Sequence, residues 1–173
     1  MPLDASSLNT EISGSTSNSY VTLQEFVDYA DLRLNINPFR EATADDRIRA
    51  LIMAAARLNS ENWSSARSLV SQALAWPRID VPRIDTQSYL VTDNTSIYYA
   101  YNEIPREIKE AQYELALAYL SGFETENERD VDSFQTDGVI VRFAPRSAKK
   151  DLLPQSVARL IAPFTRGNRL IRA

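Results

Sequence analysis

The stretch NEIPREIKEAQYELALAYLSG, residues 102–122, is the clearest helix signal in the chain. Pro105 stands near the first helical position, where its missing N–H removes no hydrogen bond. Apolar residues then recur every three or four positions, and Gly122 is the kind of residue that ends a helix. Apolar side chains on several sides predict a helix that is mostly buried. The expected core positions are Ile108, Ala111, Tyr113, Leu115, Leu117, Ala118 and Leu120.

Four shorter helices are predicted by the same spacing of apolar residues. Thr22 and Glu25 form a capping-box pattern, in which the side chain of each accepts from the backbone N–H of the other. Prolines mark other boundaries, because a proline fits only the first turn of a helix. The expected helices cover 23–34, a segment beginning at Thr43, 64–75, and a short segment from Pro154 to Pro163.

Two regions are predicted to be β-structure. In SYLVTDNTSIYYAY, the runs Tyr89–Val91 and Ile97–Tyr101 flank a polar turn, which predicts a hairpin. GVIVRFA, residues 138–144, is rich in β-branched residues and predicts a strand, with Val139, Val141 and Phe143 on one face and Ile140 and Arg142 on the other. The predicted fold class is therefore mainly α, a compact domain of four to five helices with a small β-hairpin or strand element and extended arms at both ends.

The chain divides into three parts on these patterns. Residues 1–19 are rich in Ser, Thr and Asn without periodicity, so we expect a flexible N-terminal arm. Residues 20–164 contain the predicted helices, with 80–104 as a β-like insertion. Residues 165–173 form a basic C-terminal tail.

The composition excludes several classes of chemistry. Among its 173 residues the chain has no cysteine and no histidine, which removes disulfides, thiolate metal sites, hydrolytic triads and most zinc enzymes. No phosphate-binding loop, dinucleotide glycine pattern or calcium loop is present, and the acidic clusters lack metal-ligand spacing. We expect no enzymatic activity, no cofactor and no metal. The first residues do not resemble a signal peptide and no apolar run could cross a bilayer, so we expect a soluble protein made in the cytosol, without a membrane partner.

Charge is unevenly distributed along the chain. Residues 1–141 contain 11 Lys and Arg against 22 Asp and Glu, whereas 142–173 contain 8 basic residues and one acid. Such a contrast is typical of an interaction tail. The acidic body is a poor general surface for DNA, because contacts to phosphate need Lys and Arg.

The two tryptophans allow two interpretations. Trp63 and Trp76 could stack on nucleobases, as aromatic side chains do in single-strand binders. The mixed charges around them favour a packing role instead. In WPR, we expect Trp76, Pro77 and Arg78 to form a corner of the scaffold, with Arg78 paired to an acidic neighbour within the chain or on another subunit.

Two groups of residues are candidates for contacts with other proteins. Exposed tyrosines are common at interfaces, so the side chains of the predicted hairpin either pack internally or contact a tail protein or a neighbouring copy. The C-terminal tail either frays in solvent or docks into a partner protein, where its arginines would pair with carboxylates. The hairpin candidates are Tyr89, Tyr98, Tyr99 and Tyr101, and the tail candidates are Arg166, Arg169, Leu170, Ile171 and Arg172.

The order of the motifs resembles a known family. NSYVTLQEFVDYA, RALIMAAARLN, LAWPR, EIPREIKEAQYELALAYL, GVIVRFA and LLPQSVARLIAPF follow one another over residues 18–172. This series is similar to the head–tail connector proteins of tailed bacteriophages, also called adaptor, head-completion or neck proteins, including those described as DnaT-like. Residues 80–104 depart from the family, since they are longer and more β-like.

The resemblance implies a structural protein of the virion, located in the neck between capsid and tail. A ring of neighbouring copies, usually twelve, would lie beneath the portal protein, extend the DNA channel and offer a docking platform to the tail or tail-completion protein. Double-stranded DNA would pass through without specific binding. The C-terminal tail would bind the portal.

Two other functions compete with the adaptor. The DnaT-like description implies a single-stranded-DNA-binding protein related to primosomal proteins, against which the charge distribution argues. A metal-dependent enzyme has only scattered carboxylates to support it.

Overall fold

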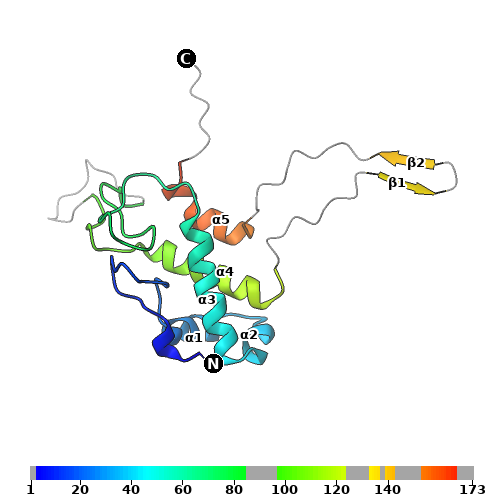
Figure 1. The fold of residues 1–173 in the computed structure, drawn as a ribbon, viewed down its shortest axis with the longest axis horizontal. Coiled ribbons are helices and arrows are strands. Elements are labelled where there is room, and N and C mark those ends of the chain that lie inside the picture. The colour runs from blue at the N-terminus through cyan, green and yellow to red at the C-terminus, as the bar shows by residue number, and fades with distance from the viewer. Residues whose placement is uncertain (1–2, 85–96, 124–132, 137–138, 143–152, 167–173) are drawn as a thin grey trace, which may run out of the picture.

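The computed structural model describes residues 3–84, 97–123, 133–136, 139–142 and 153–166. It is mainly helical, as predicted, with five α-helices and two short strands in this part of the chain (Figure 1). The elements are η1 (Ala5–Ser7), α1 (Leu23–Asp31), α2 (Asn37–Glu41), α3 (Ala44–Asn59), α4 (Arg106–Leu120), β1 (Ser133–Thr136), β2 (Val139–Arg142), α5 (Gln155–Ile161) and η2 (Ala162–Phe164).

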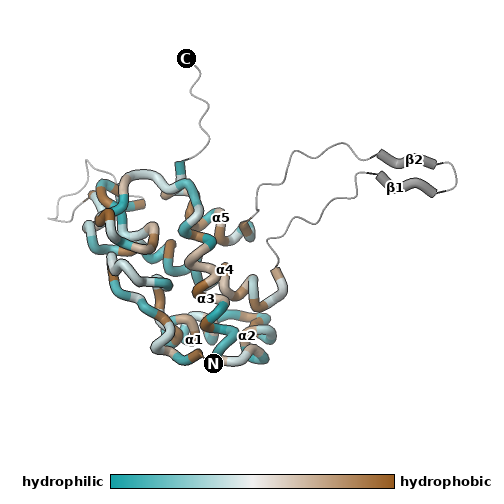
Figure 2. Tube along the Cα trace, viewed as in Figure 1, coloured by the Kyte–Doolittle hydropathy of each residue, from teal (hydrophilic) through white to brown (hydrophobic). Residues whose placement is uncertain are grey.

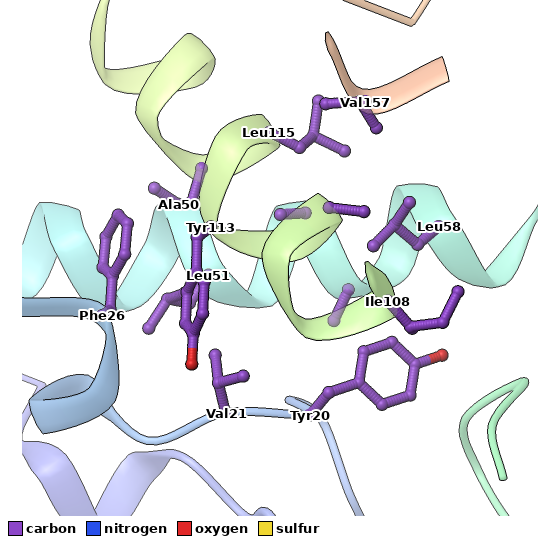
Figure 3. Close-up of a cluster of buried hydrophobic side chains, with 14 of the residues drawn as sticks. Tyr20, Val21, Phe26, Ala50, Leu51, Leu58, Ile108, Tyr113, Leu115 and Val157 are labelled. Atoms are coloured by element: carbon purple, nitrogen blue, oxygen red, sulfur yellow. The ribbon is translucent and has the colours of Figure 1, made fainter. Parts of the chain in front are cut away.

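The core lies where α4 crosses α3 and meets α5 (Figure 1). Apolar and polar residues are interspersed along α3 and α4 (Figure 2). α3 buries one side and exposes the other, whereas α4 is buried or half-buried at every position after Arg106, as predicted. Phe26 of α1 stacks on Tyr113 of α4 with ring centroids 6.1 Å apart, beside Leu51 of α3 (Figure 3). From α5, Val157 packs against this core and is fully buried.

One polar side chain lies inside this apolar core. Gln112 of α4 is fully buried. Its oxygen accepts from the Tyr20 N–H at 3.0 Å. Its amide nitrogen donates to Ser19 Oγ at 2.8 Å and to the Leu51 carbonyl at 2.9 Å. The single amide therefore joins α4 to α3 and to the segment before α1.

The helix boundaries follow the predicted signals. Thr22 and Glu25 form the capping box, and Thr43 caps α3 by accepting from the Asp46 N–H. Pro105 stands immediately before α4. At the other end Gly122 has a φ of 82°, and the N–H groups of Gly122 and Phe123 donate to the carbonyls of Tyr119 and Ala118. This pattern is the Schellman motif, which needs a left-handed residue and so favours glycine.

Two helix predictions differ from the structure. The helix predicted over 23–34 ends at Asp31, and a separate short helix, α2, contains Pro38 in its first turn. The proline begins a helix here instead of ending one, because its fixed φ suits the first turn. The helix predicted over 64–75 is wrong, since these residues form a loop.

Residues 64–75 form a loop because their backbone groups bond outside the segment. Its backbone bonds with distant segments: Ser68 N–H donates to the Pro77 carbonyl and Ser64 N–H to the Phe164 carbonyl. Two of the apolar residues that suggested a helix face water, with Leu69 50% and Val70 102% exposed, whereas Leu74 is buried. Long-range hydrogen bonds have therefore replaced the local ones that a helix would make.

Residues 3–19, the described part of the predicted N-terminal arm, contain η1 and are otherwise irregular, and they make hydrogen bonds within the segment and to the body of the chain. Asn18 accepts from the Asn9 N–H and donates to the Ser7 carbonyl. The Ala73 N–H donates to the Gly14 carbonyl at 3.0 Å, which fastens the segment to the 64–75 loop. The short polar side chains that suggested disorder instead bond to the backbone.

The β-structure is partly as expected. Val139–Arg142 is a strand, and it pairs antiparallel with Ser133–Thr136, which had not been predicted. Of the predicted hairpin, Tyr89–Val91 lies outside the described residues. Ile97–Tyr99 bonds with Val81–Arg83, with Arg83 N–H donating to the Ile97 carbonyl at 2.8 Å and Tyr99 N–H to the Val81 carbonyl at 2.9 Å.

The Gln112 network makes a stability prediction. Gln112→Met keeps the volume similar but leaves the buried Tyr20 N–H without a partner, so the free energy of unfolding falls by about 2 kcal/mol. Urea denaturation measures this loss. Gln24→Met, at an exposed position of α1, is the matched control and changes stability by less than about 0.5 kcal/mol. Equal stability of the two variants would contradict the role given to Gln112.

Candidate nucleic-acid interface

Trp76 lies in a corner of the core formed by three aromatic rings. It packs edge to face against Trp63, with centroids 5.6 Å apart, and against Phe164 at 5.3 Å. All three side chains are buried. The tryptophans are therefore not available to stack on a base in this structure, and they fill a packing role between the 64–75 loop, the chain after it and η2.

Arg78 is buried beside this corner, and its partners differ from the prediction. Its guanidinium donates to the Ser64 carbonyl at 2.7 Å, the Ala75 carbonyl at 2.9 Å and the Ser65 carbonyl. No carboxylate pairs with it among the described residues. The expected acidic neighbour is thus replaced by loop carbonyls, because the loop folds around the side chain.

Three arginines come together at this corner. Burial lowers the pKa of Arg78 first, and the nearby positive charges of Arg67 and Arg166 lower it further. Arg67 and Arg166 are exposed. Segments 62–83, 97–103 and 153–166 together contain five arginines and two acids, Asp80 and Glu103, and Glu103 pairs with Arg83 at 2.8 Å. The corner therefore has a positive potential although the body of the chain is acidic.

Two exposed tyrosines lie beside the arginines. Tyr98 is 44% and Tyr101 69% exposed. The Ser68 hydroxyl donates to the Tyr101 carbonyl, which places that tyrosine next to the loop that carries Arg67. Tyr99 instead packs on Phe164 beneath the surface. We call Arg67, Arg78, Arg166, Tyr98 and Tyr101 the arginine–tyrosine face.

Acidic residues gather on α1 and α4. Residues 23–33 and 106–120 contain six acids and three basic residues. The Tyr29 hydroxyl donates to Glu114 at 2.7 Å, and Arg33 pairs with the same carboxylate at 2.7 Å. Burial, followed by the bond to Glu114, raises the pKa of Tyr29 to about 12. Negative charge thus predominates on these two helices, and Glu107 at the start of α4 also raises the pKa of Tyr99, after the larger effect of burial.

Some of the residues that were predicted to contact other proteins lie in the described part of the chain, and others lie outside it. Arg166 is held at the surface by its N–H, which donates to the Asn62 carbonyl at 2.8 Å. Pro77 is buried. The sequence reasoning missed Arg67, because only the long-range pairing of the loop brings it near Arg166. Four tail residues and one tyrosine lie outside the described residues: Tyr89, Arg169, Leu170, Ile171 and Arg172.

Two further features are absent from the described part of the chain. No group of three or more His, Cys, Asp or Glu residues there could hold a metal ion. No helix in the same part is long and apolar enough to cross a membrane.

The fold and this face define a small helical protein with one cationic, tyrosine-bearing corner. Residues 9–173 match the model of a family described as "Putative DnaT-like ssDNA binding protein". Because the match covers nearly the whole chain, the protein belongs to this DnaT-like family. No curated protein and no solved structure matches it.

The buried arginine makes a second stability prediction. Arg78→Met removes three donors and leaves buried loop carbonyls without partners, which lowers the free energy of unfolding by about 2–3 kcal/mol. Urea denaturation followed by tryptophan fluorescence measures this, since Trp63 and Trp76 lie at the corner. Arg159→Met, at an exposed position of α5, is the control. If both variants unfold at the same urea concentration, Arg78 does not hold the loop.

Proposed function

We propose that the protein binds single-stranded nucleic acid through the arginine–tyrosine face. The observation that carries the proposal is the grouping of Arg67, Arg78 and Arg166 beside the exposed rings of Tyr98 and Tyr101. Single-strand binders combine positive charge along the backbone with aromatic rings on which bases stack. The family description supports the same function.

Each residue of the face has a distinct role in this proposal. Arg67 and Arg166 are exposed and contact phosphates. Arg78 is bonded to carbonyls, so it holds the loop and adds positive potential without touching the strand. Tyr98 and Tyr101 stack on bases, which gives affinity without reading the sequence.

The acidic net charge of the body does not oppose this function. The average over residues 1–141 conceals the difference in charge between the positive corner and the helices α1 and α4. A strand bound at the corner meets arginines first, and the acids on α1 and α4 discourage binding elsewhere on the body. These charges therefore confine binding of the nucleic acid to the arginine–tyrosine face.

A second candidate is the head–tail adaptor of a bacteriophage neck. The order of the motifs supports it, and so does the fixed exit of the C-terminal tail, where Ser64 N–H donates to the Phe164 carbonyl and Arg166 N–H to the Asn62 carbonyl. In this role a ring of copies docks beneath the portal through the tail, binds a tail protein on its other side and lets double-stranded DNA pass. In neither role does the protein act as an enzyme.

Binding of a fluorescein-labelled oligo(dT) of 20 nucleotides, followed by anisotropy at 50 and 200 mM NaCl, tests the first proposal. We expect affinity that falls with salt, because phosphate contacts release counterions. Arg67→Ala/Arg166→Ala weakens binding about tenfold or more at 50 mM NaCl, and Tyr98→Ala/Tyr101→Ala weakens it by a similar factor, since each stacked base contributes about 1–3 kcal/mol.

Arg40→Ala/Arg49→Ala is the matched control, because it removes the same charge from residues outside the face and leaves binding within about twofold. An intact protein that does not bind the oligonucleotide at 50 mM NaCl overturns the proposal. Formation of a ring on purified portal by such a protein would then favour the adaptor.

A further inference from the structure

A groove between α1 and α4 lies outside the arginine–tyrosine face. Its volume is about 320 Å³. Tyr29, Leu32 and Tyr113 provide its apolar lining, and the Leu32 side chain is 87% exposed. A leucine this exposed beside a groove has apolar surface that a partner could cover.

The charged lining of the groove consists of three acids, Glu25, Asp28 and Glu110, and two basic residues, Arg106 and Lys109. Glu25 pairs with Lys109 at 3.1 Å, and Glu110 with Arg106 at 2.7 Å. Asp28 also lines the groove, and within the described part of the chain it has no ion pair. An arriving cation would therefore meet an acid that is not already neutralised.

The acids that line the groove also raise the pKa of one of its tyrosines, Tyr113. Burial raises the pKa of Tyr113, and the charge of Glu25 raises it further, followed by weaker effects that include Glu110 and Asp28. All three acids of the rim thus act at the same ring. An apolar segment flanked by positive charges suits such a groove.

The C-terminal end of the chain has this chemistry in its sequence. In RLIR, Leu170 and Ile171 stand between Arg169 and Arg172. The two aliphatic side chains match the apolar lining, and either arginine could form a charge-assisted bond with Asp28.

The reach of the tail limits the surfaces that it can contact on its own copy. Arg166 is anchored to Asn62, just beyond the end of α3, whereas α1 lies beside the start of α3 (Figure 1). α3 has 16 residues and so is about 24 Å long. The four residues from Arg166 to Leu170 span at most about 14 Å. Leu170 of one copy therefore stays within about 14 Å of its own Arg166, whereas the groove of a second copy is not subject to this limit.

We propose that the C-terminal segment of one copy docks in the α1–α4 groove of a second copy. The contact joins two different surfaces, so each copy keeps one tail and one groove free for the next, and the copies assemble into an open chain or a closed ring. It rests on the groove and the tail, not on the arginine–tyrosine face. If the proposed nucleic-acid binding also holds, linked copies bind a strand cooperatively.

The test uses full-length protein without nucleic acid, so its result is independent of the proposed function. A fluorescein-labelled peptide of residues 165–173 is titrated with the protein and followed by anisotropy. We expect saturable binding, a loss of at least tenfold for the peptide with Leu170→Asp/Ile171→Asp, and a similar loss for the protein with Asp28→Lys. A peptide with Arg169→Glu/Arg172→Glu regains binding to the Asp28→Lys protein.

Sedimentation velocity at increasing concentrations of full-length protein provides the second readout. We expect concentration-dependent assembly that Leu170→Asp/Ile171→Asp abolishes and that Val70→Asp, a change at an exposed apolar site outside the groove, leaves intact. Peptide binding that ignores Asp28→Lys overturns the proposal, because the tail then binds elsewhere. A monomer at every concentration also overturns it, and displacement of an internal tail by the peptide would show docking within one copy.

Discussion

The amide of Gln112 connects three segments that share no local sequence. It accepts from the Tyr20 N–H and donates to the Ser19 hydroxyl and the Leu51 carbonyl, all out of contact with water. A buried amide is costly without partners, so the segment before α1 can take only positions that supply them. That segment in turn fastens the 64–75 loop through Gly14. The position of the cationic corner thus depends on a bond in the middle of the core.

Separation of charge gives this small body two different surfaces. At the corner, the loop folds around Arg78 and brings Arg67 and Arg166 close enough to act on its pKa. On α1 and α4, carboxylates outnumber basic residues and rim the apolar groove. One surface suits phosphates and bases, and the other suits a basic, apolar peptide. Membership of the DnaT-like family fits the first surface, and the sequence of the C-terminal tail fits the second.

How well the sequence predicted each element depended on how local its stabilising bonds are. The capping box of Thr22 and the glycine end of α4 use bonds between near neighbours, so their patterns identified the boundaries. The 64–75 loop could not be recognised, because its backbone bonds to Phe164, 100 residues away in the sequence from Ser64. The corner of the candidate site was equally hidden, because Arg67 and Arg166 both come near Arg78 only after the loop, η2 and the aromatic rings have packed. The net charge of residues 1–141 was a poor guide to nucleic-acid binding for a related reason, because it averages over surfaces of different charge.

Hydrogen–deuterium exchange of the full-length protein with and without oligo(dT) tests most directly whether one face binds the strand. Bound nucleic acid shields the backbone that it covers and steadies the loops that carry its contacts. The account predicts slower exchange at residues 64–68, 97–101 and 163–166, and unchanged exchange over α1. Protection centred on α1 and α4, or no protection at a saturating concentration of oligonucleotide, would contradict it.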